Sequence, residues 1–278
     1  MTSLCVKECI AAVQQQGYVI IKQAAERSVV KDLLNFALNF EYSEEEKAGL
    51  LRKQQRLNGY GQNIFNVAMK RPDTLPIFIR GMHGEILKGL LNDSFYTQIP
   101  PQFPNYILRS MLLRSSLGAM PYHIDSFIPY SGSQVSVVQS ILFLNDSKID
   151  NGCTLVVPKS HQSGEYAPQG ENSDAVPLEA EAGDIVTWDS RLWHATLENK
   201  INTPRWALVG TFCRWFIKQG FDYPRSISKS MFDTLDDDEK IVYGYCSYTP
   251  SNEFDKTEIK GGLDQIRGPC IVDLIDRV

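Results

Sequence analysis

The feature that most constrains the fold is a series of short, strand-like segments that runs from residue 106 to residue 217. Each segment is rich in Val, Ile, Leu, Thr or aromatic residues, a composition typical of β-strands. Turn-forming pairs such as Asn145-Asp146 and Asn151-Gly152 separate them. Many short strands in succession predict a sandwich or a jelly roll. The segments are Tyr106–Leu113, Gln134–Leu144, Thr154–Val157, Asp184–Trp188 and Arg205–Ile217.

The residues before this series predict helices and one more strand. Gly17–Ile21 is a β-rich run, and apolar residues recur at helical spacing over 29–38 and again over 79–92. The predicted fold class is therefore mainly β with flanking helices, built on a double-stranded β-helix of the jelly-roll or cupin-like kind. With 278 residues, one domain is expected. It would comprise a helical buttress with the first strands (1–105), the jelly-roll core (106–217) and C-terminal loops (218–278), of which 218–268 are a candidate lid.

Composition excludes several classes of function. The net charge of -5 gives no basic footprint for nucleic acid, and no apolar run is long enough to span a membrane. The six cysteines are scattered without Cys-x-x-Cys spacing, which argues against a usual zinc site. With no secretory signal evident, we expect a cytoplasmic protein that acts on a small molecule. Nothing in the sequence specifies an oligomeric state.

Histidine is scarce, which shortens the search for a metal site. The chain has four histidines, and His123, in the β-rich part of the chain, has a carboxylate two residues away, at Asp125. In an extended segment, side chains two apart share a face and can reach one ion. His194 would complete a set of two imidazoles and one carboxylate, the facial triad of non-haem iron(II) oxygenases. Of the other two, His161 is interpreted as structural and His83 as an exposed or helix-capping residue.

The residues after His194 favour a dicarboxylic co-substrate. Arg205 lies eleven residues beyond His194, at the start of the last long strand, and Thr196 lies two residues beyond it. A 2-oxo acid that chelates iron leaves a far carboxylate in the pocket, and a buried carboxylate must be paired and hydrogen-bonded. Arginine offers a bidentate fork, and a hydroxyl adds a further bond. This spacing predicts a 2-oxoglutarate site.

Several motifs, in order, resemble the phytanoyl-CoA dioxygenase family. They are the opening strand Gly17–Ile21, the pair His123-Ile124-Asp125, the segment from Asn151-Gly152 to Ser160-His161, the segment from Ala182-Gly183-Asp184 to Trp193-His194, and Thr203-Pro204-Arg205. The resemblance implies iron(II) at His123, Asp125 and His194, with 2-oxoglutarate at Arg205 and Thr196 and dioxygen as the oxidant. It also implies a polar strand residue facing the metal, for which Gln139 is the candidate. Lys159 departs from the family's usual glycine.

The resemblance further implies hydroxylation of an unactivated carbon, with release of succinate and CO2. In related halogenases the position of Asp125 is Ala or Gly, so this carboxylate favours hydroxylation. Candidate substrate-contacting residues are Phe127, Trp193, Met120 and Asn63. We expect a small metabolite of secondary metabolism, for instance in natural-product tailoring of the cylindrospermopsin type. The acidic residues near 233–239 suggest a cationic substrate.

Two other readings remain open at this point. One is a cupin-type metal enzyme that does not use 2-oxoglutarate, in which Arg205 and Thr196 would have no role. The other is a non-catalytic β-sandwich that binds carbohydrate or a partner. Anaerobic addition of iron(II) and 2-oxoglutarate separates these readings, because only the oxygenase should give the visible charge-transfer band of the chelate.

Overall fold

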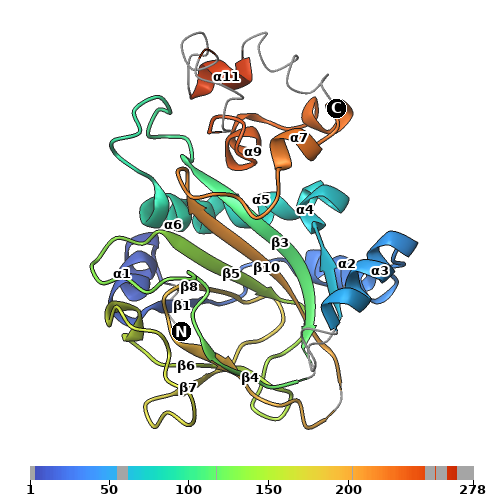
Figure 1. Cartoon of the computed structure of the whole chain (residues 1–278), viewed down its shortest axis with the longest axis vertical. Coiled ribbons are helices and arrows are strands. Elements are labelled where there is room, and N and C mark those ends of the chain that lie inside the picture. Colours follow the sequence, from blue (N-terminus) through green and yellow to red (C-terminus); the bar gives the residue numbers. More distant parts are fainter. Residues whose placement is uncertain are drawn as a thin grey trace.

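The computed structural model describes residues 4–54, 62–116, 118–201 and 203–247, together with residue 254 and residues 262–267. Its strands form two antiparallel sheets (Figure 1). The six-stranded sheet has the order β1-β8-β5-β10-β3-β2, and the four-stranded sheet has the order β4-β9-β6-β7. The strands are β1 (Tyr18–Ile21), β2 (Asn63–Phe65), β3 (Tyr106–Ser116), β4 (Met120–His123), β5 (Val137–Phe143), β6 (Thr154–Val156), β7 (Val176–Leu178), β8 (Ile185–Asp189), β9 (His194–Thr196) and β10 (Arg205–Arg214).

Helices cover one face of the six-stranded sheet. The N-terminal helices are α1 (Val6–Gln16), α2 (Arg27–Leu38), α3 (Glu44–Gln54), α4 (Val67–Lys70), α5 (Leu75–Ile79) and α6 (Gly81–Leu91). Those after the last strand are α7 (Tyr223–Ser226), α8 (Lys229–Phe232), α9 (Asp237–Val242) and α11 (Leu263–Arg267). None of the helices in the described ranges has the length and apolar character needed to cross a membrane.

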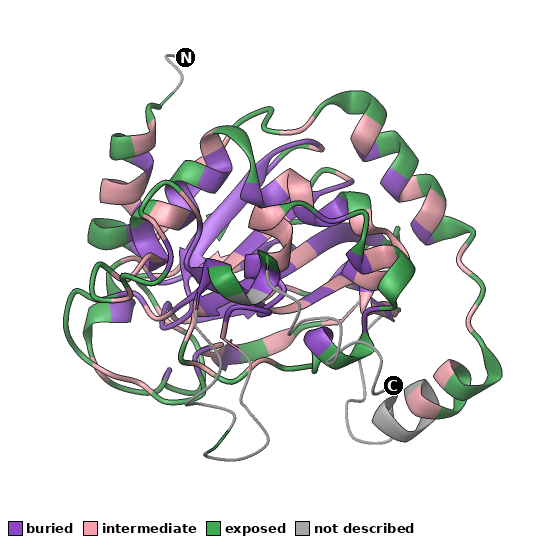
Figure 2. Cartoon of the chain, turned by 90° about the horizontal axis from the view of Figure 1, so that it is seen from above, coloured by how far each residue is buried: buried purple, intermediate pink, exposed green. Residues whose placement is uncertain are grey.

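The alternation of side chains along the strands divides the interior into two layers. Leu108, Met111 and Leu113 of β3 face the helices and join the main core with Phe78 and Leu87. This core is the purple band between the strands and the largely green outer faces of the helices in Figure 2. The intervening β3 residues belong to the opposite face, between the two sheets. The metal ligands and Arg205 predicted from the sequence line a pocket in the space between the sheets.

The predicted jelly-roll core with flanking helices is confirmed, and most predicted elements lie within a few residues of their expected bounds. The helix α1, the edge strand β2 and the short strands β4, β7 and β9 were not predicted. Strands of three or four residues offer too few alternations to stand out in a sequence.

The C-terminal segment, predicted as long loops with a short helix, is more helical than expected. Residues 218–247 form three short helices, and Tyr223, Tyr243 and Tyr245 are fully buried in the main core. Two residues of the acidic cluster are paired with arginine, Asp236 with Arg80 and Asp237 with Arg267. In Figure 1, α9 lies at the top of the molecule and β4 at the bottom. The described part of this segment is thus a component of the core, and the remainder of 248–278 lies outside the described residues.

Candidate metal and co-substrate site

Two neighbouring strands of the smaller sheet bring the metal-binding histidines together. His123 at the end of β4 and His194 at the start of β9 face each other in register, and their ring centroids are 4.1 Å apart. Asp125 follows β4 directly, and its backbone N–H donates to the carbonyl of Ser190 at 2.8 Å. The carboxylate is thereby held against the segment that leads into His194.

The ligand atoms of these three residues can hold one ion. They lie within 4.8 Å of one another, with Asp125 Oδ1 3.8 Å from His123 Nε2 and Asp125 Oδ2 3.3 Å from His194 Nε2. Each histidine uses Nδ1 on a backbone carbonyl, that of Pro121 for His123 and that of Leu192 for His194, both at 2.9 Å. A proton held at Nδ1 leaves the Nε2 lone pair for a metal.

Electrostatics support the same assignment. Burial lowers the pKa of His194, against the opposing effect of the Asp125 carboxylate, and so favours the neutral imidazole that a metal requires. The indole N–H of Trp188 donates to Asp125 Oδ2 at 3.4 Å, which helps to orient the carboxylate. Among the described residues this is the group of His, Cys, Asp and Glu side chains with metal-binding geometry. The donor set fits iron(II).

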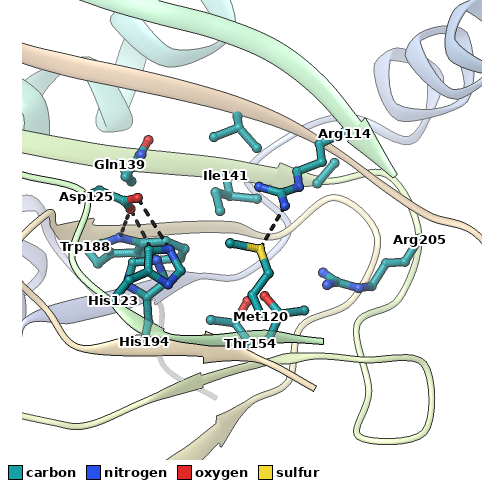
Figure 3. Close-up of a pocket in the computed structure, with 13 residues that line it drawn as sticks. Arg114, Met120, His123, Asp125, Gln139, Ile141, Thr154, Trp188, His194 and Arg205 are labelled. Carbon is teal, nitrogen blue, oxygen red and sulfur yellow. Dashed lines mark hydrogen bonds and ion pairs between the residues drawn. The ribbon is translucent and has the colours of Figure 1, made fainter. Parts of the chain in front are cut away.

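Arg205 enters the same pocket from the other side, as Figure 3 shows. Its side chain is buried, and Nη2 donates to the carbonyl of Gly152 at 2.7 Å. Its Nε is buried without a hydrogen-bond partner among the residues that the structure describes. Burial, with a further contribution from the positive charge of Arg114, lowers the pKa of Arg205 to about 10. A desolvated cation of this kind is suited to an anionic ligand.

Two hydroxyl groups and a second arginine complete this end of the pocket. Thr196 and Thr154 lie opposite each other on β9 and β6, and both line the pocket. Arg114 on β3 also lines it and donates to the sulfur of Met120 at 2.8 Å. Arg114 and Thr154 were not identified from the sequence. The available signal for Arg114 was a cation that follows the apolar run Met111–Leu113 within a predicted strand.

The remaining predicted site residues fall into two groups. Gln139 and Met120 line the pocket, which encloses about 100 Å³. Phe127 is exposed beside it, the Trp193 indole donates to the carbonyl of Glu165 at 3.0 Å, and Asn63 lies on the edge strand β2. These last three are not part of the pocket wall. A role in substrate binding stays a prediction for Met120, Phe127, Trp193 and Asn63.

The two other histidines lie away from the pocket. The ring of His161 contacts the carbonyl of Gln14 at 3.1 Å, in keeping with a structural role. The interpretation of His83 as exposed or capping is wrong, because its side chain is buried behind the sheet. Its Nδ1 is 2.7 Å from the carbonyl of Phe78, and its Nε2 is 2.9 Å from Thr187 Oγ1. Both partners lie on other elements, so helical spacing alone could not reveal them.

Comparison with known proteins identifies relatives over most of the chain. The profile described as Phytanoyl-CoA dioxygenase (PhyH) matches residues 13–207. Over 187 residues the chain is 30% identical to an uncharacterised protein of Mycobacterium tuberculosis, which covers 66% of this chain. The chain spans 64% of the length of that relative.

Solved structures share the fold at low sequence identity. HygX from Streptomyces hygroscopicus, solved with nickel and 2-oxoglutarate bound, is 11% identical with a TM-score of 0.58, over 77% of this chain and 89% of HygX. SnoN, an α-ketoglutarate-dependent epimerase from nogalamycin biosynthesis, is 15% identical with a TM-score of 0.54, over 75% of this chain and 82% of SnoN. At these sequence identities, the similarity shows a shared fold and nothing about the reaction.

Proposed function

This chain belongs to the phytanoyl-CoA dioxygenase family of iron(II)- and 2-oxoglutarate-dependent oxygenases, and we propose that it hydroxylates a carbon atom of a small metabolite. The observation that carries the proposal is the single pocket shared by the triad and the buried Arg205. A triad alone would suit any cupin-type metal enzyme. The desolvated guanidinium beside it, with two threonine hydroxyls, is explained by a co-substrate with a second carboxylate.

Each residue of the pocket has a distinct task in this proposal. His123, Asp125 and His194 would hold iron(II) through Nε2 and carboxylate oxygens, leaving the remaining positions to co-substrate and dioxygen. Arg205, with Thr154 and Thr196, would bind the far carboxylate of 2-oxoglutarate. Bound iron would supply the activation of dioxygen, coupled to decarboxylation of 2-oxoglutarate to succinate and CO2. The protein contributes position and the exclusion of water.

Hydroxylation is proposed over other outcomes of the same machinery. Asp125 occupies the position that halogenases leave empty for halide, and its backbone and side chain are both held, by Ser190 and Trp188. SnoN shares the fold and is described as an epimerase, so fold alone does not choose the reaction. The product of turnover distinguishes them, because hydroxylation adds one oxygen atom to the substrate and epimerisation adds none.

The first experiment asks whether iron(II) and 2-oxoglutarate meet in this pocket. Anaerobic addition of both to the protein should produce the weak visible charge-transfer band of a chelate between iron(II) and a 2-oxo acid. His194→Ala should abolish the band through loss of iron. Arg205→Met should leave iron bound but raise the 2-oxoglutarate concentration needed for the band by at least tenfold, because one charge-assisted pair contributes roughly 1.5–3 kcal/mol.

A well-folded protein that binds iron(II) in this site and shows no band with 2-oxoglutarate would contradict the proposal and favour a metal enzyme without this co-substrate. A protein that binds no iron would favour a non-catalytic sandwich. Where the band forms, release of succinate can be screened against a metabolite library, and the mass of each product reports whether oxygen was added.

A further inference from the structure

A row of polar side chains crosses the inner face of the large sheet at the level of the metal ligands. Register places Ser110, Thr211, Gln139 and Trp188 side by side on β3, β10, β5 and β8. Trp188 contacts the metal ligand Asp125, so the row leads away from the triad across the sheet. It lies two residues along the strands from the row of Leu112, Val209 and Ile141, of which Val209 and Ile141 line the co-substrate pocket.

Hydrogen bonds along this row fix the direction in which Gln139 presents its amide. Ser110 Oγ donates to Thr211 Oγ1 at 3.2 Å, and Thr211 Oγ1 donates to Gln139 Oε1 at 2.7 Å. The oxygen of the Gln139 amide is therefore occupied as an acceptor. Its NH2 group is left to face the pocket as a donor. A ligand beside the metal meets a hydrogen-bond donor at this position.

Arg109 lies next to Ser110 and is the extra residue of a β-bulge. Thr211 pairs with Ser110 but Phe212 pairs with Leu108, so Arg109 has no partner on β10. A bulge re-aims a side chain out of the regular alternation, and bulges occur often beside active sites. The carbonyl of Arg109 accepts a hydrogen bond from the N–H of Gly220 at 2.9 Å, and this bond to the segment after β10 holds the bulge in place.

The bulge aims the guanidinium of Arg109 at the loop that carries Asp125. Its central carbon lies 4.5 Å from the ring centroid of Phe127, two residues after the metal ligand. The positive charge of Arg109 also acts on the buried Cys213 of β10. Burial raises the pKa of this thiol to about 12, and the charge of Arg109 opposes that effect. Among the residues that the structure describes, no carboxylate forms an ion pair with Arg109. The cation is half-buried and can accept an anionic ligand.

We propose that Arg109 and Gln139 form a substrate subsite for an oxyanion, a carboxylate or a phosphate carried by the small organic substrate. Both residues present hydrogen-bond donors, and Arg109 adds a full positive charge, so the subsite matches an acceptor-rich anion. The inference rests on the proposed function, because it takes the substrate to bind beside the iron. It replaces the expectation of a cationic substrate, since three of the acidic residues behind that expectation are already in ion pairs, Asp236 with Arg80, Asp237 with Arg267 and Asp233 with Lys229.

The test uses three probes that share a phenyl ring and differ in charge: phenylacetate, phenyl phosphate and phenylacetamide. Binding beside the metal is measured by the paramagnetic relaxation of the probe protons in the presence of protein loaded with manganese(II) and 2-oxoglutarate. At least one anionic probe should bind about tenfold more tightly than the neutral amide. Which anion binds more tightly identifies the group as a carboxylate or a phosphate.

Matched variants assign the effect to Arg109. Arg109→Met should weaken the preferred anion to the level of phenylacetamide and leave the amide unchanged, whereas Arg109→Lys should keep part of the preference. Arg27→Met removes the same charge from an exposed position of α2 and should change nothing. Circular dichroism and the 2-oxoglutarate chelate band, recorded on each variant, report whether the fold and the co-substrate site are intact.

Equal binding of the three probes to the wild-type protein would overturn the inference while leaving the proposed function standing. So would an Arg109→Met variant that keeps the preference for anions, or that weakens all three probes equally. Failure of iron(II) and 2-oxoglutarate to form their chelate would instead refute the proposed function, and this inference with it.

Discussion

Arg205 should destabilise the protein when 2-oxoglutarate is absent. Its side chain is 6% exposed, and burial lowers its pKa to about 10. An ordinary arginine has a pKa of roughly 12.5 or more, and one pKa unit corresponds to about 1.4 kcal/mol, so the buried charge costs the fold roughly 3 kcal/mol. Replacing Arg205 by Met removes that cost. It also removes the hydrogen bond to Gly152 and leaves that carbonyl unpaired, which costs about 1–2 kcal/mol.

The Arg205→Met variant should therefore be more stable than the wild type by about 1–2 kcal/mol, which is roughly 2–6 °C in Tm for a chain of this size. Thermal unfolding is followed by fluorescence, with the same divalent metal present throughout and with Arg27→Met as the control. Adding 2-oxoglutarate at about 100 times the wild-type Kd should stabilise the wild type by roughly 2.7 kcal/mol and Arg205→Met by no more than about 1.4 kcal/mol, because the Kd of the variant is at least tenfold higher. A variant that is less stable than the wild type, and that gains as much stability from 2-oxoglutarate as the wild type, would refute the assignment and make Arg205 a structural residue.

Three further changes test neighbouring parts of the structure. Burial lowers the pKa of His83 to about 4, so His83 is neutral in the fold, and stability should fall as pH drops from about 6.5 towards 4. Denaturant unfolding should show a loss of about 2 kcal/mol between pH 7 and pH 5 that is absent in His83→Gln. An unchanged pH dependence in that variant would contradict this reasoning. Phe127 has φ +68°, a left-handed conformation that suits glycine. Phe127→Gly should stay within about 1 kcal/mol of wild-type stability in denaturant unfolding yet lose part of the preference for anionic probes, and retention of the full preference would remove Phe127 from the subsite. Arg191 pairs with the buried Asp189 and donates to the carbonyls of Tyr130 and Gly132, in the loop after Asp125. Arg191→Lys should weaken iron(II) binding about 10- to 100-fold in competition with a chromophoric chelator. An unchanged affinity would show that the contacts of Arg191 do not position the metal ligand Asp125.

The metal pair was predictable because local geometry combines with the residues that follow His194. His123 and Asp125 are two residues apart, and the alternation of an extended chain puts them on one side whatever the rest of the fold does. The same rule identifies Gln139 once its strand is recognised. Arg205 could be assigned to the pocket only by a further chemical argument, that a dicarboxylic co-substrate requires a cation for its second carboxylate.

Features that depend on contacts between elements were beyond the same reasoning. The buried His83 is hydrogen-bonded to Phe78 of the neighbouring helix α5 and to Thr187 of β8, a strand far along the sequence. The tyrosines at 223, 243 and 245 did carry a signal, since three large side chains in an acidic segment predict burial more readily than a mobile lid. The acidic residues of this segment suggested an exposed loop, whereas its buried tyrosines determine where it packs.

Arg109 shows why the substrate side of such a pocket is harder to predict than the co-substrate side. Strict alternation along β3 would put Arg109 and Ser110 on opposite faces of the sheet. The bulge allows both side chains to lie near the space between the two sheets. Burial also separates the two arginines. Arg205 is almost fully desolvated, which strengthens its attraction for an anion and lowers the stability of the empty protein. Arg109 keeps part of its hydration and the ring of Phe127, so its charge costs the fold less and binds an anion less tightly. A co-substrate common to every turnover thus meets the more strongly attracting cation, and a substrate that must leave after oxidation meets the weaker one.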